Sequence, residues 1–291
     1  MSLMVKARLQ SVLLVMACFV GLGQLTVDSS FGECTRFLYK QQPPTGVQNK
    51  EFRSICQRYN NQPRYATLYD TVKRIPFYSA YTFKRSDGEK HMNFHWMYEP
   101  QLSSLSATGN MVPFLQVEPE LKIDEAQAVL EDYADTTMYE RGQLNPDEHQ
   151  ATPDDKAATY TLTNVVPQVK DFYRKLWSHY LNSVRRRLNN YCHGTAYVVT
   201  GVITTGSTIR KENIDRLAIP KYIWSAYCCP DFDPNAPYEI RYKFPSFAAY
   251  GLNDIASNFI MEVSQKRVEA LIKQHMPVDQ NFQLFASNCI L

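Results

Sequence analysis

The chain has 291 residues, of which 44% are hydrophobic and 13% aromatic. This composition is typical of a globular protein and excludes the disordered and fibrous classes. The 31 Lys and Arg residues nearly balance the 29 Asp and Glu residues. Because the chain as a whole carries no strong positive field, any contact with nucleic acid has to rely on a local basic patch.

The N-terminus has the pattern of a secretory signal peptide. Lys6 and Arg8 form a short basic region, an apolar stretch follows over residues 12–22, and Gly23 is a small residue at the expected cleavage point. The alternative is a buried N-terminal helix. We assign residues 1–23 to a signal peptide and residues 24–291 to one mature domain, and we expect a secreted, extracellular protein. No later stretch has the roughly 18 consecutive apolar residues of a transmembrane helix, so no transmembrane segment is predicted.

The cysteines fit this route. Loss of the signal peptide would remove Cys18 and leave an even set, which predicts up to three disulfides in an oxidising compartment without fixing their pairing. Cys228 and Cys229 are adjacent, and neighbouring residues in a strand point to opposite faces, so each is expected to bond to a distant partner. No second close pair of Cys or His completes a zinc site. The disulfide candidates are Cys34, Cys56, Cys192, Cys228, Cys229 and Cys289.

The first half of the chain mixes strand and turn signals. Residues 31–60 contain two cysteines and a Pro-Pro-Thr-Gly turn, and we interpret them as a stapled cover on the domain. Residues 65–69 and 75–83 are rich in β-branched and aromatic residues around a charged turn, which predicts a hairpin, and residues 95–98 predict a further strand. Apolar spacing predicts a helix over residues 124–133. Residues 139–163 are polar and rich in turn formers.

The second half predicts one long amphipathic helix, over residues 169–190, followed by strands and a last helix. The strands are expected over residues 196–203, 218–229 and 239–244. The last helix is expected over residues 264–275, with Val268, Leu271 and Ile272 pointing inward. Because strands cluster without regular helical crossovers, and no repeat or linker is present, the sequence predicts a single α+β domain.

Two motifs and a tryptophan stand in order in the middle of the chain. Tyr-Glu-Arg-Gly-Gln-Leu-Asn-Pro occupies residues 139–146, Leu-Thr-Asn-Val-Val-Pro-Gln occupies residues 162–168, and Trp177 follows. This order resembles the DNA/RNA non-specific endonucleases, whose signature is Asp-Arg-Gly-His, then Leu-Ser/Thr-Asn-x-x-Pro-Gln, then a tryptophan near a helix start. The resemblance is closer to one branch of that family, the endonuclease domain-containing 1 proteins. Residues 31–34, 55–58, 66–69, 74–76, 141–144 and 224–229 carry it across nearly the whole mature chain.

The resemblance implies a ββα-metal core, also called a His-Me finger, in a disulfide-bonded domain. In that family a histidine deprotonates water, a divalent cation neutralises charge on the phosphate, and an arginine stabilises the transition state. Arg141 stands at the arginine position and Asn164 at the first asparagine position. The resemblance therefore implies transition-state stabilisation and nucleic-acid contact for Arg141, and support of the metal site for Asn164.

Three positions depart from the family pattern. Gln143 stands where the family has its catalytic histidine, and an amide cannot accept a proton near neutral pH. Counted without gaps from Asn164, Tyr173 stands at the metal-ligand asparagine and Leu181 at an acidic residue. A neutral phenol is a poor ligand for Mg²⁺. The sequence therefore predicts a degenerate catalytic site.

A substitute base is conceivable in the segment that follows the first motif. His149 lies there among Asp147, Glu148, Asp154 and Asp155. The favoured interpretation is a solvated acidic loop that ends by capping a helix. The alternative is a relocated base or a carboxylate metal site.

Two further clusters contain residue types used in binding. His91 and His95 are four residues apart, but no third metal ligand is indicated. Arg185, Arg186 and Arg187 form the densest basic cluster. Such a cluster is either a solvated helix face or a nucleic-acid contact, and Arg185 and Arg186 are the nucleic-acid candidates.

Two functions remain in competition. In the favoured one, Gln143, Tyr173 and Leu181 mark a protein with weak or no catalysis that uses the fold to bind nucleic acid or an extracellular protein. In the alternative, the protein is an active endonuclease that hydrolyses DNA or RNA phosphodiester bonds with a substitute base, Arg141 and Asn164. That alternative requires Mg²⁺ or another divalent cation, whereas the first requires no cofactor.

Overall fold

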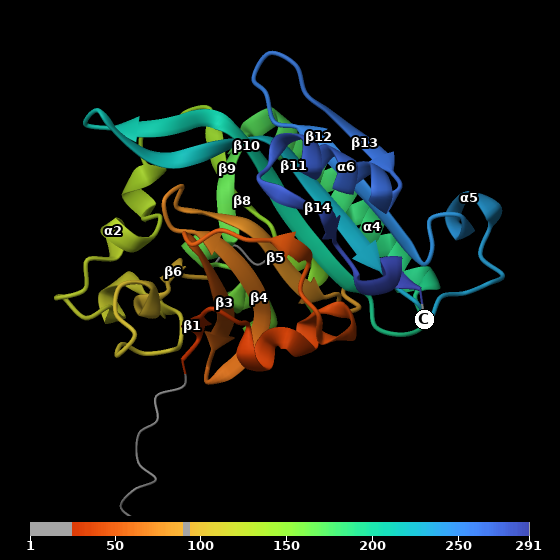
Figure 1. The fold of residues 1–291 in the computed structure, drawn as a ribbon, viewed down its shortest axis with the longest axis horizontal. Helices are drawn as coiled ribbons and strands as arrows, with labels where there is room; N and C mark the ends of the chain where they lie inside the picture. The colour runs from red at the N-terminus through yellow and green to blue at the C-terminus, as the bar shows by residue number, and fades with distance from the viewer. Residues whose placement is uncertain (1–24, 90–93, 291) are drawn as a thin grey trace, which may run out of the picture.

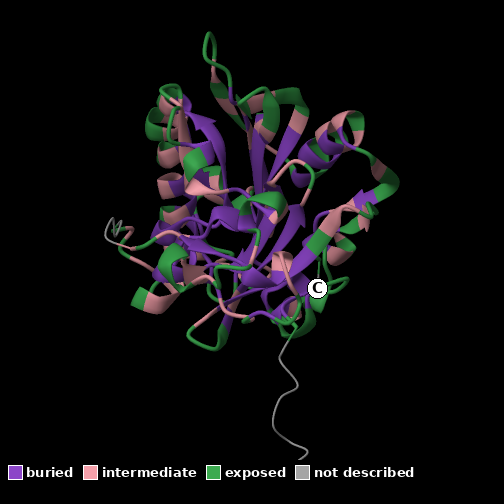
Figure 2. Cartoon of the chain, turned by 90° about the vertical axis from the view of Figure 1, so that its left-hand side faces the viewer, coloured by how far each residue is buried: buried purple, intermediate pink, exposed green. Residues whose placement is uncertain are grey.

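An antiparallel sheet of eight strands organises the protein, in the order β1-β3-β4-β5-β10-β11-β12-β13 (Figure 1). This computed structural model describes residues 25–89 and 94–290. Strand β5 (Ile75–Thr82) lies inside the sheet and is buried along its whole length, because apolar layers cover both faces. Figure 2 shows the buried strands between outer segments that are exposed or partly exposed.

The two faces of the sheet pack against different layers. Val198 faces a core shared with helix α4 (Ser178–Tyr191) and the π-helical segment η9 (Phe172–Trp177) that precedes it. Its neighbour Val199 faces a second core, which helix α6 (Gln265–His275) and the N-terminal segment cover. Successive strand residues point to opposite faces, so an almost continuously apolar strand suits this three-layer arrangement.

The other elements are connections, caps and two-stranded ribbons around this framework. The hairpin β8–β9 lies on the α4 side and is described with the candidate site. The arm formed by β10 and β11 extends beyond the sheet at one end (Figure 1). The remaining bounds are β1 Val27–Asp28, β2 Thr45–Val47, β3 Phe52–Tyr59, β4 Gln62–Asp70, β6 Met97–Tyr98, β7 Val112–Pro113, β8 Tyr139–Gln143, β9 Val165–Val169, β10 Tyr197–Lys211, β11 Ile214–Cys228, β12 Ser246–Leu252, β13 Phe259–Val263, β14 Val278–Gln283, α2 Ile123–Ala126, α3 Pro153–Ala158 and α5 Tyr238–Arg241.

The six candidate cysteines form three disulfides, as the sequence predicts: Cys34–Cys56, Cys192–Cys229 and Cys228–Cys289. The adjacent Cys228 and Cys229 belong to different cores, on opposite faces of the sheet. Each therefore reaches a distant partner, and one strand end is fixed to both covering layers.

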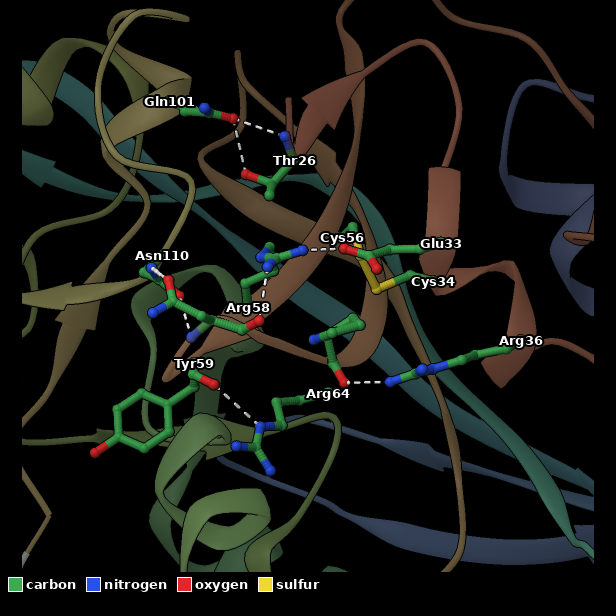
Figure 3. Close-up of polar contacts among 12 residues, drawn as sticks. Thr26, Glu33, Cys34, Arg36, Cys56, Arg58, Tyr59, Arg64, Gln101 and Asn110 are labelled. Atoms are coloured by element: carbon green, nitrogen blue, oxygen red, sulfur yellow. Dashed lines mark hydrogen bonds and ion pairs between the residues drawn. A yellow bond between two sulfur atoms is a disulfide. The ribbon is translucent and has the colours of Figure 1, made fainter. Parts of the chain in front are cut away.

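The segment over residues 31–60 is more than a cover. Its second half is strand β3, the second strand of the sheet. Its first half is tied down as Figure 3 shows: Cys34 bonds to Cys56 on β3, Glu33 pairs with Arg58, and Arg36 donates to the carbonyl of Pro63 at 2.9 Å. The interpretation as a cover is thus correct for the first half and wrong for the second.

The helix expected over residues 124–133 is broken. Only α2 and a 3-10 turn (Leu130–Asp132) form, because Gln127 between them has an extended backbone. The side chain of Gln127 accepts a hydrogen bond from the backbone N–H of Glu99 and donates one to its carbonyl, at 2.9 and 2.8 Å. Tertiary hydrogen bonds have overridden the local helical pattern.

Other expected boundaries also shift. The strand expected over residues 239–244 is wrong, since a short helix, α5, follows Pro237 there. The long helix begins at Lys170 instead of Val169, because Val169 still belongs to β9, and η9 continues it from Phe172. The helix over residues 264–275 is confirmed as α6, with Val268 and Ile272 buried and Leu271 partly buried. Within the described residues, no helix has the length and apolar character to cross a membrane, and the expected signal peptide, residues 1–23, lies outside them.

A disulfide stabilises a fold by lowering the entropy of the unfolded chain, and the effect grows with the length of the loop it closes. Replacing each disulfide pair by alanine tests whether the disulfides of this protein act in this way. Cys228 and Cys289 are separated by 61 residues and Cys34 and Cys56 by 22. Loss of the first pair is expected to lower the free energy of unfolding by about 4 kcal/mol and loss of the second by about 3 kcal/mol. Urea unfolding of the two double variants measures both, and a larger loss from the shorter loop would contradict the account.

Candidate functional site

The two motifs build an antiparallel pair of strands, β8 and β9, that leads into a helix. In β8, Gly142 pairs with Val166 and Gln143 pairs with Val165 of β9, and η9 and α4 follow directly. A β-carbon on Gly142 would overlap the buried side chain of Gln168, so a larger residue here would displace Gln168. The motifs thus produce the ββα arrangement that the resemblance implies.

Asn164 holds this hairpin to the sheet. Its Oδ1 accepts hydrogen bonds from the hydroxyl of Ser79 on β5 and from the backbone N–H of Asn145, at 2.9 and 3.0 Å. Its Nδ2 donates to the carbonyls of Asn145 and Thr159, both at 2.9 Å. The side chain is fully buried and its amide is saturated. Asn164 therefore positions the β8–β9 strands against the sheet, and a direct role in metal binding stays a prediction.

Gln143 is turned into the protein at the base position. Its Nε2 donates to the carbonyl and the hydroxyl of Thr159, at 3.1 and 2.9 Å, and the residue is only 7% exposed. An amide nitrogen has no lone pair that takes up a proton near neutral pH. Gln143 therefore connects β8 to the segment before β9 and supplies no base.

Arg141 lies beside a group of aromatic rings. Its guanidinium carbon is 4.8 Å from the ring centroid of Trp96, and Trp96 and Phe94 lie 5.2 and 5.3 Å from the ring of Tyr160. Arg141 and these rings are partly exposed. A cation over an aromatic face is stabilised and keeps its N–H edges available for anions. This aromatic group, Phe94, Trp96 and Tyr160, was missed from the sequence because nothing in it marks those residues as neighbours of Arg141.

The other two altered positions sit on the helix side. Tyr173 in η9 is partly buried against the core that contains α4. Burial and the charge of Asp147 raise the pKa of the nearby Tyr160, and Tyr173 adds a smaller effect in the same direction. Leu181 on α4 is buried in the same core. An aliphatic side chain and a neutral phenol thus stand where the motif spacing predicts an acid and an amide, and that correspondence stays a prediction.

His149 is held as a neutral ring. Its Nε2 lies 3.0 Å from the carbonyl of Leu181, which can only accept, so Nε2 carries the proton and Nδ1 accepts from the hydroxyl of Tyr81 at 2.9 Å. Burial is the main cause that lowers the pKa of His149 to about 4; the hydrogen bond to Leu181 opposes this shift and the charge on Arg185 adds to it. With both nitrogens engaged and no exposure, His149 does not serve as a substitute base here.

The interpretation of the acidic segment as a solvated loop is wrong for its first part, whereas Asp154 and Asp155 are partly exposed. Asp147, Glu148 and His149 are all buried. The segment does lead into a capped helix, because the hydroxyl of Thr152 accepts from the backbone N–H of Asp155 at the start of α3. Burial follows from packing between strand β5 and helix α4, which the charge pattern does not report.

Comparison with known proteins places this fold. The family model of the DNA/RNA non-specific endonucleases matches residues 44–270. The chain belongs to this family. The human and mouse Endonuclease domain-containing 1 proteins are each 32% identical to it, over 209 and 212 residues. These matches cover 69% and 70% of this chain and 40% of either relative, so the chain spans well under half of their length.

A solved structure supports the fold independently of close sequence identity. A crystal structure of the EndoG/EndoGI complex, which addresses the mechanism of EndoG inhibition, has a TM-score of 0.51 and 15% identity. The match covers 88% of this chain and 95% of that one. The prediction of one mixed α and β domain with a nuclease-like core is therefore confirmed.

Endonucleases of this family are typically metal-dependent, but the donors in this chain do not fit a divalent cation. The amide oxygen of Asn164 already accepts two hydrogen bonds, and Tyr173 and Leu181 offer poor or no ligands. Across the residues that the structure describes, no group of three or more His, Cys, Asp and Glu side chains is placed to hold a metal. His95 is exposed, and His91 lies outside the described residues.

The basic cluster on α4 divides into three environments. Arg185 donates to the carbonyl of Ser86 at 2.8 Å, and Arg187 is buried in an ion pair with Glu262. Arg186 alone of the three is exposed. The cluster is therefore no single nucleic-acid patch, and a phosphate contact by Arg185 or Arg186 stays a prediction.

Removing the side-chain amide of Asn164 is expected to destabilise the protein strongly. The variant Asn164→Ala removes four hydrogen bonds and leaves buried groups without partners, so the free energy of unfolding is expected to fall by about 3 kcal/mol. Gln143→Ala removes only the contacts to Thr159 and is expected to cost about 1 kcal/mol. Denaturant unfolding compares the two, and equal effects would contradict a central role for Asn164.

The buried His149 predicts a pH-dependent stability. Its pKa is lowered in the folded protein from 6.5 to about 4, so its contribution is present above pH 6.5 and is lost as the pH falls toward 4. The variant His149→Gln is expected to remove a few kcal/mol of this dependence. The measurement is the difference in free energy of unfolding between wild type and variant from pH 7.5 to 4, and a difference that stays constant would contradict it.

Proposed function

We propose that this protein is an endonuclease-family member that binds nucleic acid through the β8–α4 region and has lost, or nearly lost, hydrolysis. The observation that carries the proposal is Gln143, an amide at the base position whose nitrogen donates to Thr159. Without a group that removes a proton from water, general-base catalysis of about 10²–10⁴-fold is unavailable. His149 supports the same conclusion, because both of its ring nitrogens are hydrogen-bonded and it is not available as a substitute general base.

The binding half of the proposal rests on Arg141 and the aromatic group. Arg141 can contact phosphate, and the partly exposed rings of Trp96 and Tyr160 can stack on unpaired bases. Because the chain has no strong net positive charge, affinity would come from this local arrangement rather than from a broad basic surface. Single-stranded nucleic acid is the better fit, since only unpaired bases expose their faces for stacking.

We also propose that the protein is secreted. Three disulfides are typical of proteins that fold in an oxidising compartment, and the pattern of residues 1–23 fits a signal peptide. An extracellular protein partner is compatible with the same scaffold, and one structural neighbour of this chain comes from a crystal structure of the EndoG/EndoGI complex.

A nuclease and binding experiment tests the proposal. Purified wild type and Gln143→His are incubated with plasmid DNA and single-stranded RNA in Mg²⁺, Mn²⁺ or chelator. We expect no cleavage by wild type and none by Gln143→His alone, because Tyr173 and Leu181 leave the metal positions without ligands. Cleavage by wild type that chelator stops would overturn the proposal and favour an active enzyme with a substitute base.

Binding is measured on labelled single-stranded DNA with the same protein. Arg141→Ala is expected to weaken binding about tenfold, the effect of losing one charge-assisted contact. Arg53→Ala is the matched control, because Arg53 is an exposed arginine on β3, bonded to the carbonyl of Lys50. Equal affinity of the two variants would refute the assignment of the site to Arg141.

A further inference from the structure

A pocket of about 390 Å³ lies next to the aromatic group near Arg141. It is lined by Tyr59 and Asn61 from the end of β3 and the turn that follows, by Phe94, and by Asn110 from the segment before β7. This volume lies within the range of small-molecule binding sites, which is roughly 300–1,000 Å³. The pocket and the aromatic group share Phe94. A ligand that lies over the rings beside Arg141 therefore reaches the pocket.

Two asparagine side chains hold each other in place at this pocket. Asn61 lies in the tight turn between β3 and β4 with a φ of 58°, a left-handed conformation that asparagine tolerates. Its backbone N–H donates to Oδ1 of Asn110 at 2.9 Å, and Nδ2 of Asn110 donates to Oδ1 of Asn61 at 2.7 Å (Figure 3). Within the described residues, Nδ2 of Asn61 has no hydrogen-bond partner and its Oδ1 accepts only this one bond. The Asn61 amide thus keeps a donor group and an acceptor site for a ligand.

A neutral amide edge of this kind matches adenine. Asparagine can bond to two neighbouring groups of this base, accepting from the N6 amino group and donating to N7. Guanine presents two acceptors at the same edge and is read by Arg or Lys, whereas Asp or Glu accepts from the amino group of cytosine. Among the described residues that line the pocket there is no Arg, Lys, Asp or Glu. The lining therefore favours adenine over the other bases.

A line of rings connects the pocket to Arg141. The ring centroid of Tyr160 lies 5.3 Å from that of Phe94 and 5.2 Å from that of Trp96. The guanidinium carbon of Arg141 lies 4.8 Å from the Trp96 centroid. Successive bases of an unpaired strand can stack on such rings while the backbone contacts the cation. A strand therefore fits better than a free nucleotide, because one nucleotide offers a single base to several stacking positions.

We propose that this pocket binds one unpaired adenine of a single strand whose phosphate contacts Arg141. Oδ1 of Asn61 accepts from the N6 amino group of adenine, Nδ2 of Asn61 donates to N7, and the ring of Phe94 stacks on the base. Asn110 is a positioning residue, because it fixes the Asn61 amide. The inference rests on the proposed function: Arg141 gives affinity for any sequence, and the pocket adds a preference for adenine.

Binding of labelled single-stranded DNA of about 12 nucleotides tests the proposal. One strand contains only thymine, and two others carry adenine or 7-deazaadenine at the same central positions. We expect the adenine strand to bind about tenfold more tightly than the thymine strand, which is the effect of one bidentate contact to a base. 7-Deazaadenine keeps the ring for stacking but lacks N7, so most of this gain is expected to be lost.

Substitutions in the turn identify the residue that reads the base. Asn61→Gly removes the amide and suits a left-handed turn, so it is expected to bind the adenine and thymine strands equally. Asn61→Asp is expected to lose the preference as well, because it keeps the oxygen that accepts from Asn110 but has no donor for N7. Asn213→Gly is the matched control, since Asn213 is an exposed asparagine with a φ of 66° in the turn between β10 and β11. This variant should keep the wild-type preference.

The outcomes separate this inference from the proposed function. Equal binding of the adenine and thymine strands by wild type, both weakened by Arg141→Ala, would overturn the adenine pocket and leave the proposed function standing. An absence of binding to any strand would overturn both. A preference that persists in Asn61→Gly would refute the role of Asn61. Adenosine monophosphate is expected to compete only far above the concentration at which the adenine strand competes, and equal potency would refute a strand as the ligand.

Discussion

The side-chain amide of Asn164 is the contact on which the candidate site depends. It forms hydrogen bonds to three separate segments: to Ser79 on β5 of the central sheet, to Asn145 in the turn after β8, and to Thr159 at the end of α3. A buried amide can satisfy such a set because it offers two donor and two acceptor positions in one plane. Any residue without both functions leaves a buried backbone group unpaired.

The residues near Asn164 fall into two groups: those that maintain the fold and those at predicted catalytic positions. Gly142 is required by its close approach to Gln168, and Trp177 is fully buried in the core under the sheet. These residues keep the ββα geometry. Gln143, Tyr173 and Leu181 are the residues that the motif spacing predicts at catalytic and metal-binding positions, and here they contact the protein itself. The residues that maintain the fold thus differ from those predicted to give it activity, and membership of a fold family does not by itself determine activity.

This separation explains how far the sequence could predict the structure. The motifs place β8, β9 and the helix after them, because glycine, asparagine and tryptophan have steric and hydrogen-bonding requirements that are local to the hairpin. Helix α6 follows from its apolar spacing alone. The broken helix near Gln127 was not predictable, since the hydrogen bonds to Glu99 come from a segment distant in sequence. The same is true of His149, whose neutrality depends on Tyr81 and Leu181 from two other elements.

The buried carboxyl of Glu99 also affects how the stability of the fold depends on pH. Burial raises the pKa of Glu99 to about 8, although hydrogen bonds from Thr161 and Thr163 lower it, so the carboxyl is protonated at neutral pH. A raised acid pKa makes the folded state bind the extra proton, and stability falls as the pH rises from 4.5 toward 8. His149 has the opposite slope between pH 4 and 6.5. Where the two ranges overlap, in mildly acidic solution, the contributions oppose each other, so a core with two buried titratable groups keeps a flatter stability profile than either group alone would give.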